Sequence, residues 1–242
     1  MTIKPSNVLA LALSGAVLAG CSSDNDFVPP PPPPPPAMAT FEVTVDNLTN
    51  AQPLSPVAVI AHATGYHVFS VGSAATAGLE EQAEGGDNMA LLAEAGADGD
   101  VRATASGAGP IGPGGTETIT IEVLESDVAT LRISTSSMLV NTNDAIAALD
   151  AVDVSTLAAG TSMTWRTIAY DAGTEANTEE AAHIPGPAGG GEGFNAARDD
   201  IADRVSMHAG VVGQDDGFAT SGLNNQHRFD NPVARVRITR ID

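Results

Sequence analysis

Apolar and polar residues alternate with a period of two over much of the chain after Thr40. The first such run begins at Phe41, where Phe and Val alternate with acidic and hydroxyl side chains. Because successive side chains of a β-strand point to opposite faces of a sheet, this alternation predicts strands with one buried face. Gly, Pro, Asn and Asp bound the runs, which is typical of antiparallel sheets. The predicted strands cover residues 41–45, 57–62, 66–71, 118–123, 131–135, 163–170 and 233–241.

Two of these predicted strands lie close together in the sequence. Residues 57–62 and 66–71 are separated by a short segment that ends at Gly65, and we expect them to form a hairpin. Between the other strands there are turn signals and little helix, a pattern that favours an all-β fold. We therefore expect an antiparallel β-sandwich with short helical insertions, folded as one domain over residues 40–242.

Helical signals are few and short. Asp87 and Asn88 are expected to cap a helix over residues 89–95 that ends at Gly96. The apolar run that follows Asp144 is open between a helical turn and a buried strand, because periodicity does not distinguish the two in a short segment.

The first 20 residues differ from the rest of the chain. Lys4 is followed by an apolar run with small residues at its end, which predicts a signal peptide over residues 1–20. The tetrapeptide Leu18-Ala19-Gly20-Cys21 then resembles the bacterial lipobox, so we expect cleavage before Cys21 and lipidation of this residue. Several acyl chains on one residue exceed what stable membrane anchoring requires. An ordinary secretory signal with an incidental cysteine is the alternative.

Residues 21–39 are expected to link the lipid to the domain. They contain eight consecutive prolines, Pro29 to Pro36, which adopt a polyproline II helix of about 3.1 Å per residue and so a spacer of roughly 25 Å. A docking peptide for an aromatic-lined partner is the alternative. Ser22, not Asp, follows the cysteine, and by resemblance to lipoprotein sorting patterns this favours the outer membrane. We expect a protein of the bacterial cell envelope, attached to the membrane through Cys21.

Net charge excludes several classes of function. The chain has 30 acidic and 10 basic residues, a formal net charge of −20, and Lys4 is its only lysine. Chemistry that needs a lysine amine, such as a P-loop or a Schiff base, is therefore excluded. So negative a chain would repel a phosphate backbone, and nucleic acid is not an expected partner. Divalent cations remain attractive partners, although solvation in salty surroundings explains the charge equally well.

No catalytic motif is evident. Cys21 is the only cysteine, so the domain has neither a disulfide nor a thiol nucleophile. There is no GxSxG elbow, and the histidines match no zinc signature. Spacing alone leaves open a carboxylate pair for glycoside hydrolysis, although aromatic residues make up only 4% of the chain. The histidines, expected to be loop or rim side chains satisfied by hydrogen bonds, are His62, His67, His183, His208 and His227.

The acidic turn after Tyr170 is the candidate site. Asp171 and Glu175 lie on either side of Gly173, which permits a tight turn. Carboxylates at this spacing can converge on one hard cation, and calcium prefers oxygen ligands of this kind. The turn is not an EF-hand, because counting from Asp171 places alanine at positions 6 and 12. A plain solvated acidic turn is the alternative.

The run Tyr-Asp-Ala-Gly-Thr-Glu over residues 170–175 resembles the aromatic-DAGTD signature of the spondin N-terminal domain family. This family occurs in extracellular matrix spondins and in many bacterial secreted proteins. Other stretches resemble further regions of the family in the same order, so that the resemblance covers about residues 40–242. They are residues 78–80, 92–96, 137–146 and 231–236.

The resemblance implies a β-sandwich that binds one calcium ion through Asp144, Asp171 and Glu175. Two departures matter: Thr-Asn-Asp stands in place of Ser-Pro-Asp, and Glu175 in place of an aspartate, which adds a methylene. The resemblance also implies a non-catalytic binding or adhesion module at the cell surface, with an extracellular polysaccharide or protein as ligand. The alternatives are a secreted or envelope-bound carbohydrate-active hydrolase and a purely structural envelope protein.

Overall fold

A computed structural model describes residues 32–197 and 202–242. The chain divides into two units, residues 1–35 and 36–242, and every described helix and strand lies in the second. The expected signal peptide over residues 1–20 and the lipidation site Cys21 lie outside the described residues. Within the described part, no helix is both long and apolar enough to cross a membrane.

The second unit consists mainly of antiparallel strands, which confirms the all-β prediction. Two short α-helices follow the second strand. They are α1 (Ala77–Gly85) and α2 (Met89–Ala97). The strands are β1 (Met38–Asn47), β2 (Ala58–His62), β3 (Val101–Ser106), β4 (Thr116–Leu124), β5 (Arg132–Met138), β6 (Ala145–Asp153), β7 (Ser162–Asp171), β8 (Ser206–Met207) and β9 (Ala234–Arg240). Short 3-10 helices cover Glu125–Thr130, Ala181–His183, Gln214–Asp216 and Asn225–His227.

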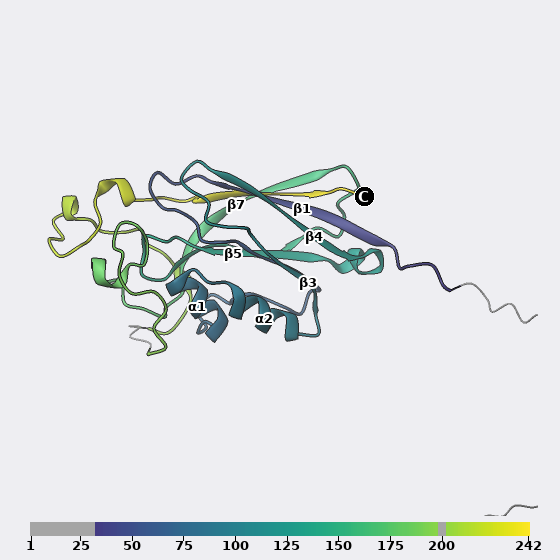
Figure 1. The fold of residues 1–242 in the computed structure, drawn as a ribbon, viewed down its shortest axis with the longest axis horizontal. Helices are drawn as coiled ribbons and strands as arrows, with labels where there is room; N and C mark the ends of the chain where they lie inside the picture. Colours follow the sequence, from purple (N-terminus) through teal and green to yellow (C-terminus); the bar gives the residue numbers. More distant parts are fainter. Residues whose placement is uncertain (1–31, 198–201) are drawn as a thin grey trace, which may run out of the picture. The chain divides into compact units, whose positions relative to one another are not determined.

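One continuous path of strand pairing runs in the order β3-β2-β5-β6-β7-β9-β1-β4, with β8 paired to β7 beside it. The strands lie in two layers that face each other (Figure 1). β7 belongs to both layers, because residues 162–167 pair with β9 and residues 168–171 pair with β6. At β7 the sheet passes from one layer to the other, and the antiparallel sheet is nearly closed.

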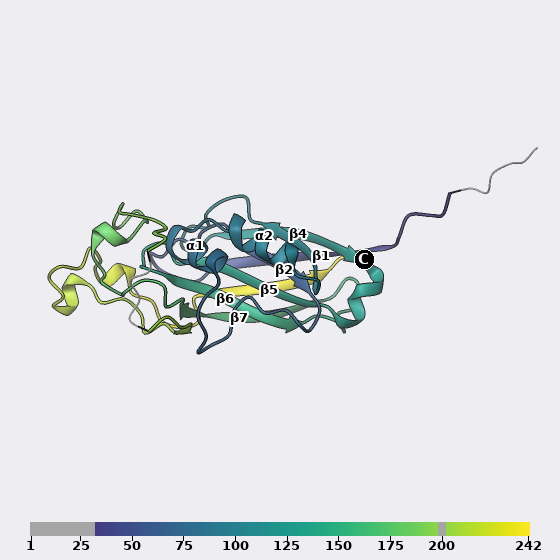
Figure 2. The ribbon, with the colours of Figure 1, turned by 90° about the horizontal axis from the view of Figure 1, so that it is seen from below.

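The two largest hydrophobic clusters stabilise the sheet and its helices. The larger one fills the space between the layers, where inward-facing residues such as Phe41, Ile133 and Val236 are buried. The smaller one lies between the sheet and the helices, with Leu79 and Leu91 packed against the outer face of the sheet. The helices lie over the β2 and β5 side of the sheet, where α1 also contacts β6, and β7 lies farther from them (Figure 2).

The expected hairpin of residues 57–62 and 66–71 is wrong. The first of these strands forms as β2, but it pairs with β3 and β5, and residues 66–71 form no strand. The backbone N–H of Val68 instead donates to a carboxylate oxygen of Asp150 at 2.8 Å. The Asp150 side chain thus takes the place of the backbone carbonyl that a neighbouring strand of a hairpin would have supplied. Residues 66–71 lie across the outer face of the sheet.

The helix predictions are partly confirmed. α2 begins at Met89 as expected, but it continues past Gly96 and ends at Ala97. α1 was not predicted, and its N-cap Thr76 accepts a hydrogen bond from the N–H of Leu79 at 3.2 Å. The ambiguous run after Asp144 is the strand β6, because β5 and β7 pair with it on both sides. Pairing with neighbouring strands therefore determines that this run is a strand and not a helical turn, which the apolar pattern alone did not distinguish.

Candidate metal centre

Strand pairing brings Asp144 and Asp171 together. Asp144 directly precedes β6, and Asp171 is the last residue of β7. Ala145 pairs with Asp171 in the β6–β7 register, so the two aspartates lie at the same end of neighbouring strands. The backbone N–H of Ala172 also donates to the carbonyl oxygen of Asp144 at 3.2 Å, which holds the loop after β7 against the start of β6.

Asp144 is completely buried, and only one of its carboxylate oxygens is satisfied. Its Oδ2 accepts hydrogen bonds from the backbone N–H groups of Thr174 at 2.8 Å and Glu175 at 3.2 Å. Its Oδ1 has no hydrogen-bond partner among the described residues. Burial raises the pKa of Asp144 to about 7, and the nearby charge of Asp171 acts in the same direction, against the two N–H groups. The site therefore favours a proton or a cation beside Asp144.

The turn around Gly173 holds Asp171 in place. Gly173 has a φ of +71°, and a Cβ at this position would lie 2.3 Å from the carbonyl oxygen of Arg204. No other residue fits there without displacing the backbone of residue 204. The N–H of Gly173 donates to Oδ1 of Asp171 at 2.8 Å, and the side-chain amide of Asn177 donates to Oδ2 at 2.6 Å.

Glu175 takes part through its backbone, as the donor to Asp144. Its half-buried side chain borders a hollow of about 120 Å³ together with Asp171 and Gly173. In residues 32–197 and 202–242, no group of three or more His, Cys, Asp or Glu side chains is arranged to hold a metal ion. The structure thus pairs two of the three predicted ligands, and the carboxylate of Glu175 is not part of a formed three-ligand cluster.

Sequence reasoning missed the buried polar residues that precede Asp144. Asn141, Thr142 and Asn143 are each at most 2% exposed, and all three make hydrogen bonds. Asn141 accepts the N–H of Ala188 at 2.9 Å, and Asn143 accepts that of Glu179 at 3.2 Å. These side chains tie several loops to the start of β6. A run of four polar residues directly before an apolar strand was the available signal.

Sequence reasoning also missed His208 as a neighbour of this site. The ring is buried, its Nδ1 accepts the N–H of Gly210 at 2.9 Å, and its Nε2 has no partner in the described part of the chain. Burial lowers the pKa of His208, and the charge of Asp171 opposes this shift. The expectation that every histidine is satisfied by hydrogen bonds is therefore wrong for this one. No sequence pattern links it to Asp171.

The fold and the site together define an all-β antiparallel domain with a buried aspartate next to a half-buried one at one end of its sheet. A scan against protein-family models finds no matching family, and no curated protein matches the chain. The resemblance to the spondin N-terminal domain remains a prediction.

Proposed function

We propose that the chain is a non-catalytic binding module of the bacterial cell envelope, attached to the outer membrane through Cys21, and stabilised by calcium at Asp144, Asp171 and Glu175. One observation carries the calcium proposal: the Oδ1 atom of Asp144 is buried without a donor beside a second carboxylate. Two hard oxygen donors next to each other suit calcium better than softer metals. The anchor and the location rest on the lipobox resemblance alone.

The residues at the site would divide the work between them. The N–H groups of Thr174 and Glu175 hold Oδ2 of Asp144, so that Oδ1 remains available as a ligand. Gly173 and Asn177 orient Asp171 by donating one hydrogen bond to each of its carboxylate oxygens. The carboxylate of Glu175 would complete the set by turning toward the two aspartates. Bound calcium supplies the neutralising charge, and the loops tied to Asn141 and Asn143 would then present a fixed surface to a partner.

A calcium titration tests this proposal. Purified protein treated with a chelator should release or absorb heat when titrated with calcium chloride, and its melting temperature should rise. At a calcium concentration one hundred times Kd, binding adds about 2.7 kcal/mol to the free energy of unfolding. Asp144→Asn should abolish both effects, whereas Asp98→Asn, in an acidic turn elsewhere, should leave them unchanged. Absence of heat together with an unchanged melting temperature would reject the calcium site.

A further inference from the structure

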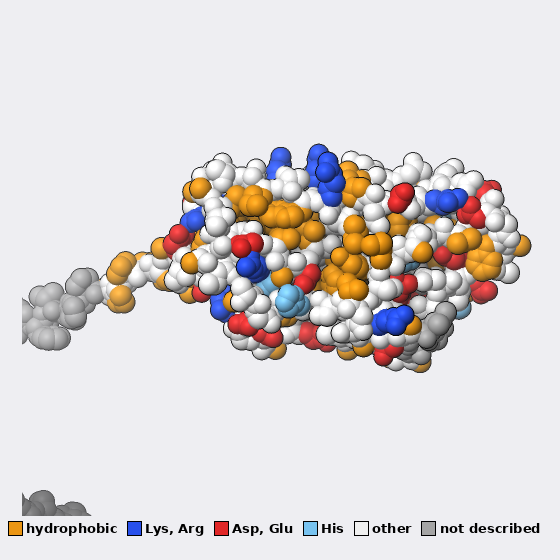
Figure 3. All heavy atoms as spheres, turned by 180° about the vertical axis from the view of Figure 1, so that it is seen from behind, with side chains coloured by type: hydrophobic (Ala, Val, Ile, Leu, Met, Phe, Trp, Pro, Cys, Tyr) orange, Lys and Arg blue, Asp and Glu red, His pale blue; other side chains and the backbone are white. Residues whose placement is uncertain are grey.

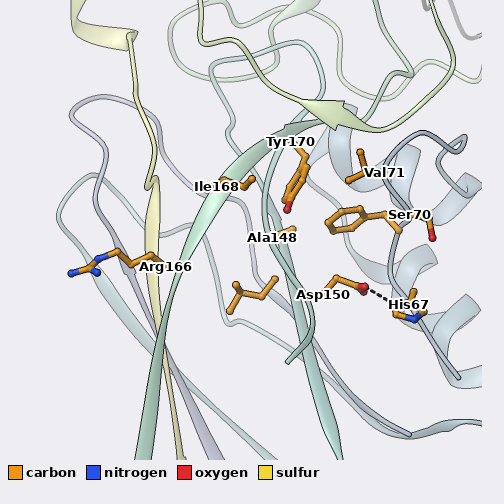
Figure 4. Close-up of a pocket in the computed structure, with 10 residues that line it drawn as sticks. His67, Ser70, Val71, Ala148, Asp150, Arg166, Ile168 and Tyr170 are labelled. Atoms are coloured by element: carbon orange, nitrogen blue, oxygen red, sulfur yellow. Dashed lines mark hydrogen bonds and ion pairs between the residues drawn. The ribbon is translucent and has the colours of Figure 1, made fainter. Parts of the chain in front are cut away.

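A second site lies on the outer face of the sheet, at residues 148–150 of β6 and at β7. A pocket of about 590 Å³ opens there between these strands and residues 67–71 (Figure 4). Seen from behind, the molecule has hydrophobic side chains gathered beside a histidine and an acidic residue (Figure 3). None of the three predicted calcium ligands lines this pocket.

A β-bulge places an acidic side chain in the pocket wall. The register between β5 and β6 shifts between Ile133 and Thr135, so Ser134 faces two residues of β6. Ala151 there has a φ of +52°, and its N–H donates to the hydroxyl of Ser134 at 2.8 Å. Bulges of this kind redirect neighbouring side chains, and strained backbone tends to occur at functional sites. The side chain redirected here is that of Asp150, which lines the pocket.

Asp150 orients His67. Its Oδ2 lies 2.5 Å from Nδ1 of His67, and its Oδ1 accepts the N–H of Val68. Because a carboxylate only accepts hydrogen bonds, Nδ1 of His67 carries a hydrogen, and in the neutral imidazole Nε2 is then an acceptor. The His67 side chain is 51% exposed, so this acceptor is accessible to a ligand.

Tyr170 supplies the complementary donor. Its ring centroid is 4.6 Å from that of Phe69, and the two tilted rings form an apolar wall. Within the described residues the Tyr170 hydroxyl has no hydrogen-bond partner, and it points into the pocket (Figure 4). Burial and the charge of Asp150 raise the pKa of Tyr170, so the phenol keeps its proton and can donate. The guanidinium of Arg166 is turned away from the other labelled residues (Figure 4).

We propose that this pocket binds a neutral, hydroxyl-rich ring, such as one or two units of a saccharide. A sugar hydroxyl can accept a hydrogen bond from the Tyr170 hydroxyl, and another can donate one to Nε2 of His67. The C–H face of the sugar ring packs on aromatic side chains. An anionic ligand would meet no cation directed into the pocket, and an amine would meet a carboxylate already engaged by His67. The volume lies within the range of small-ligand sites, about 300 to 1,000 Å³. The inference rests on the proposed role as a binding module, but not on calcium.

Saturation-transfer NMR on the purified protein tests the proposal. Cellobiose, maltose and lactose are offered at about 10 mM, which detects a Kd near 1 mM. At least one should receive magnetisation from the protein. Tyr170→Phe and His67→Ala should each weaken its binding by about 5- to 10-fold, the effect of one lost hydrogen bond. Tyr66→Phe is the matched control, because it removes the other tyrosine hydroxyl outside this pocket, and it should bind as the unaltered protein does.

Two results would overturn the proposal. The first is no transfer to any of the three sugars, or equal affinity in Tyr170→Phe, His67→Ala and the unaltered protein. The second is binding of choline in place of the sugars, lost in Asp150→Asn, because this would identify a cation pocket. Calcium and sugar titrations of the unaltered protein separate this proposal from the calcium site: sugar binding without calcium binding retains the pocket and rejects the metal, and the reverse rejects the pocket alone. Asp144→Asn should bind the sugar as the unaltered protein does.

Discussion

Two aspartates near opposite ends of β6 have opposite surroundings. Asp144, directly before the strand, is 0% exposed and has one oxygen without a donor. Asp150, in the bulge near the other end, has a side chain that is 20% exposed, and donors reach both of its oxygens. The same residue type is an unsatisfied buried charge in one place and a fully paired one in the other. The groups around an aspartate therefore determine whether its carboxylate stabilises the fold or is left with an oxygen that a ligand could bind.

A substitution at the Asp144 end of β6 should change the free energy of unfolding most. Gly173→Ala forces a Cβ against the backbone of Arg204 at a positive φ, and we expect it to lower the free energy of unfolding by about 4 kcal/mol. Urea denaturation at pH 7 measures this. Gly160→Ala is the matched control: it has a φ of +75° with nothing within 4 Å of the added Cβ, and should cost about 1 kcal/mol. Equal losses in the two variants would contradict the close packing at Gly173.

Neutralising each aspartate in turn tests the comparison itself. In calcium-free protein the folded-state pKa of Asp144 is raised to about 7, so its ionisation destabilises the fold as pH rises from about 4 to 7. Asp144→Asn should therefore raise the free energy of unfolding at pH 8 by roughly 3 kcal/mol, and have no such effect at pH 4.

Asp150→Asn should do the opposite. It removes an acceptor from His67 or Val68 and should lower the free energy of unfolding by about 1 to 2 kcal/mol. Denaturation curves of Asp144→Asn and Asp150→Asn at pH 8 measure the two free energies of unfolding. Changes of the same sign in both variants would contradict the difference between the two aspartates.

Glu179 sharpens the comparison, because it is a second buried carboxyl near the Asp144 end. Burial raises its pKa to about 7, against a hydrogen bond from the N–H of Val212. The folded protein thus retains a proton that the unfolded chain loses above about pH 4.5, and stability falls by roughly 2 kcal/mol as pH rises to 7. Glu179→Gln should remove this part of the pH dependence, measured by denaturation at pH 5 and 7.5. The exposed neighbour provides the control: Glu180→Gln should leave the slope unchanged.

The smallest effect concerns the Asp150 end. Ala151→Gly relieves a positive φ of 52° and should stabilise the protein by about 0.5 to 1 kcal/mol. Ala147→Gly, in a regular part of the same strand, should destabilise it by about 1 kcal/mol. Thermal melts of the two variants should shift in opposite directions, and a shared direction would contradict the backbone strain at the bulge.

Much of the fold could be predicted from the period-two pattern. The strands that begin near Phe41, Thr118, Leu131 and Met163 all form, because alternate burial leaves a direct trace in the sequence. The hairpin after β2 could not be predicted correctly, since its outcome depends on the Asp150 carboxylate, which is distant in sequence and replaces a backbone partner. The path of residues 66–71 therefore depends on a contact that is distant in sequence, and local patterns do not reveal such a contact.

The candidate site was predictable only where its residues are close in sequence. The Asp171 turn is visible as acids around a glycine, and the resemblance added Asp144, which strand pairing does place beside it. The buried state of Asp144 and the nearness of His208 depend on β8 and on loops that no period describes. The pocket at Asp150 could not be predicted either, because the pattern of hydrophobic and polar residues does not reveal a β-bulge.

The position of β9 in the sheet affects how the domain can assemble. This strand, residues 234–240, is the last in chain order but lies in the interior of the sheet, between β7 and β1. During synthesis the β1–β4 pair and the β2 to β7 strands can form first, yet they are joined into one sheet only when β9 inserts between them. Pairings this distant in sequence are slow to form, so a chain shortened by a few residues at β9 would leave two open strand edges. The sheet is therefore complete only when β9 is paired on both sides.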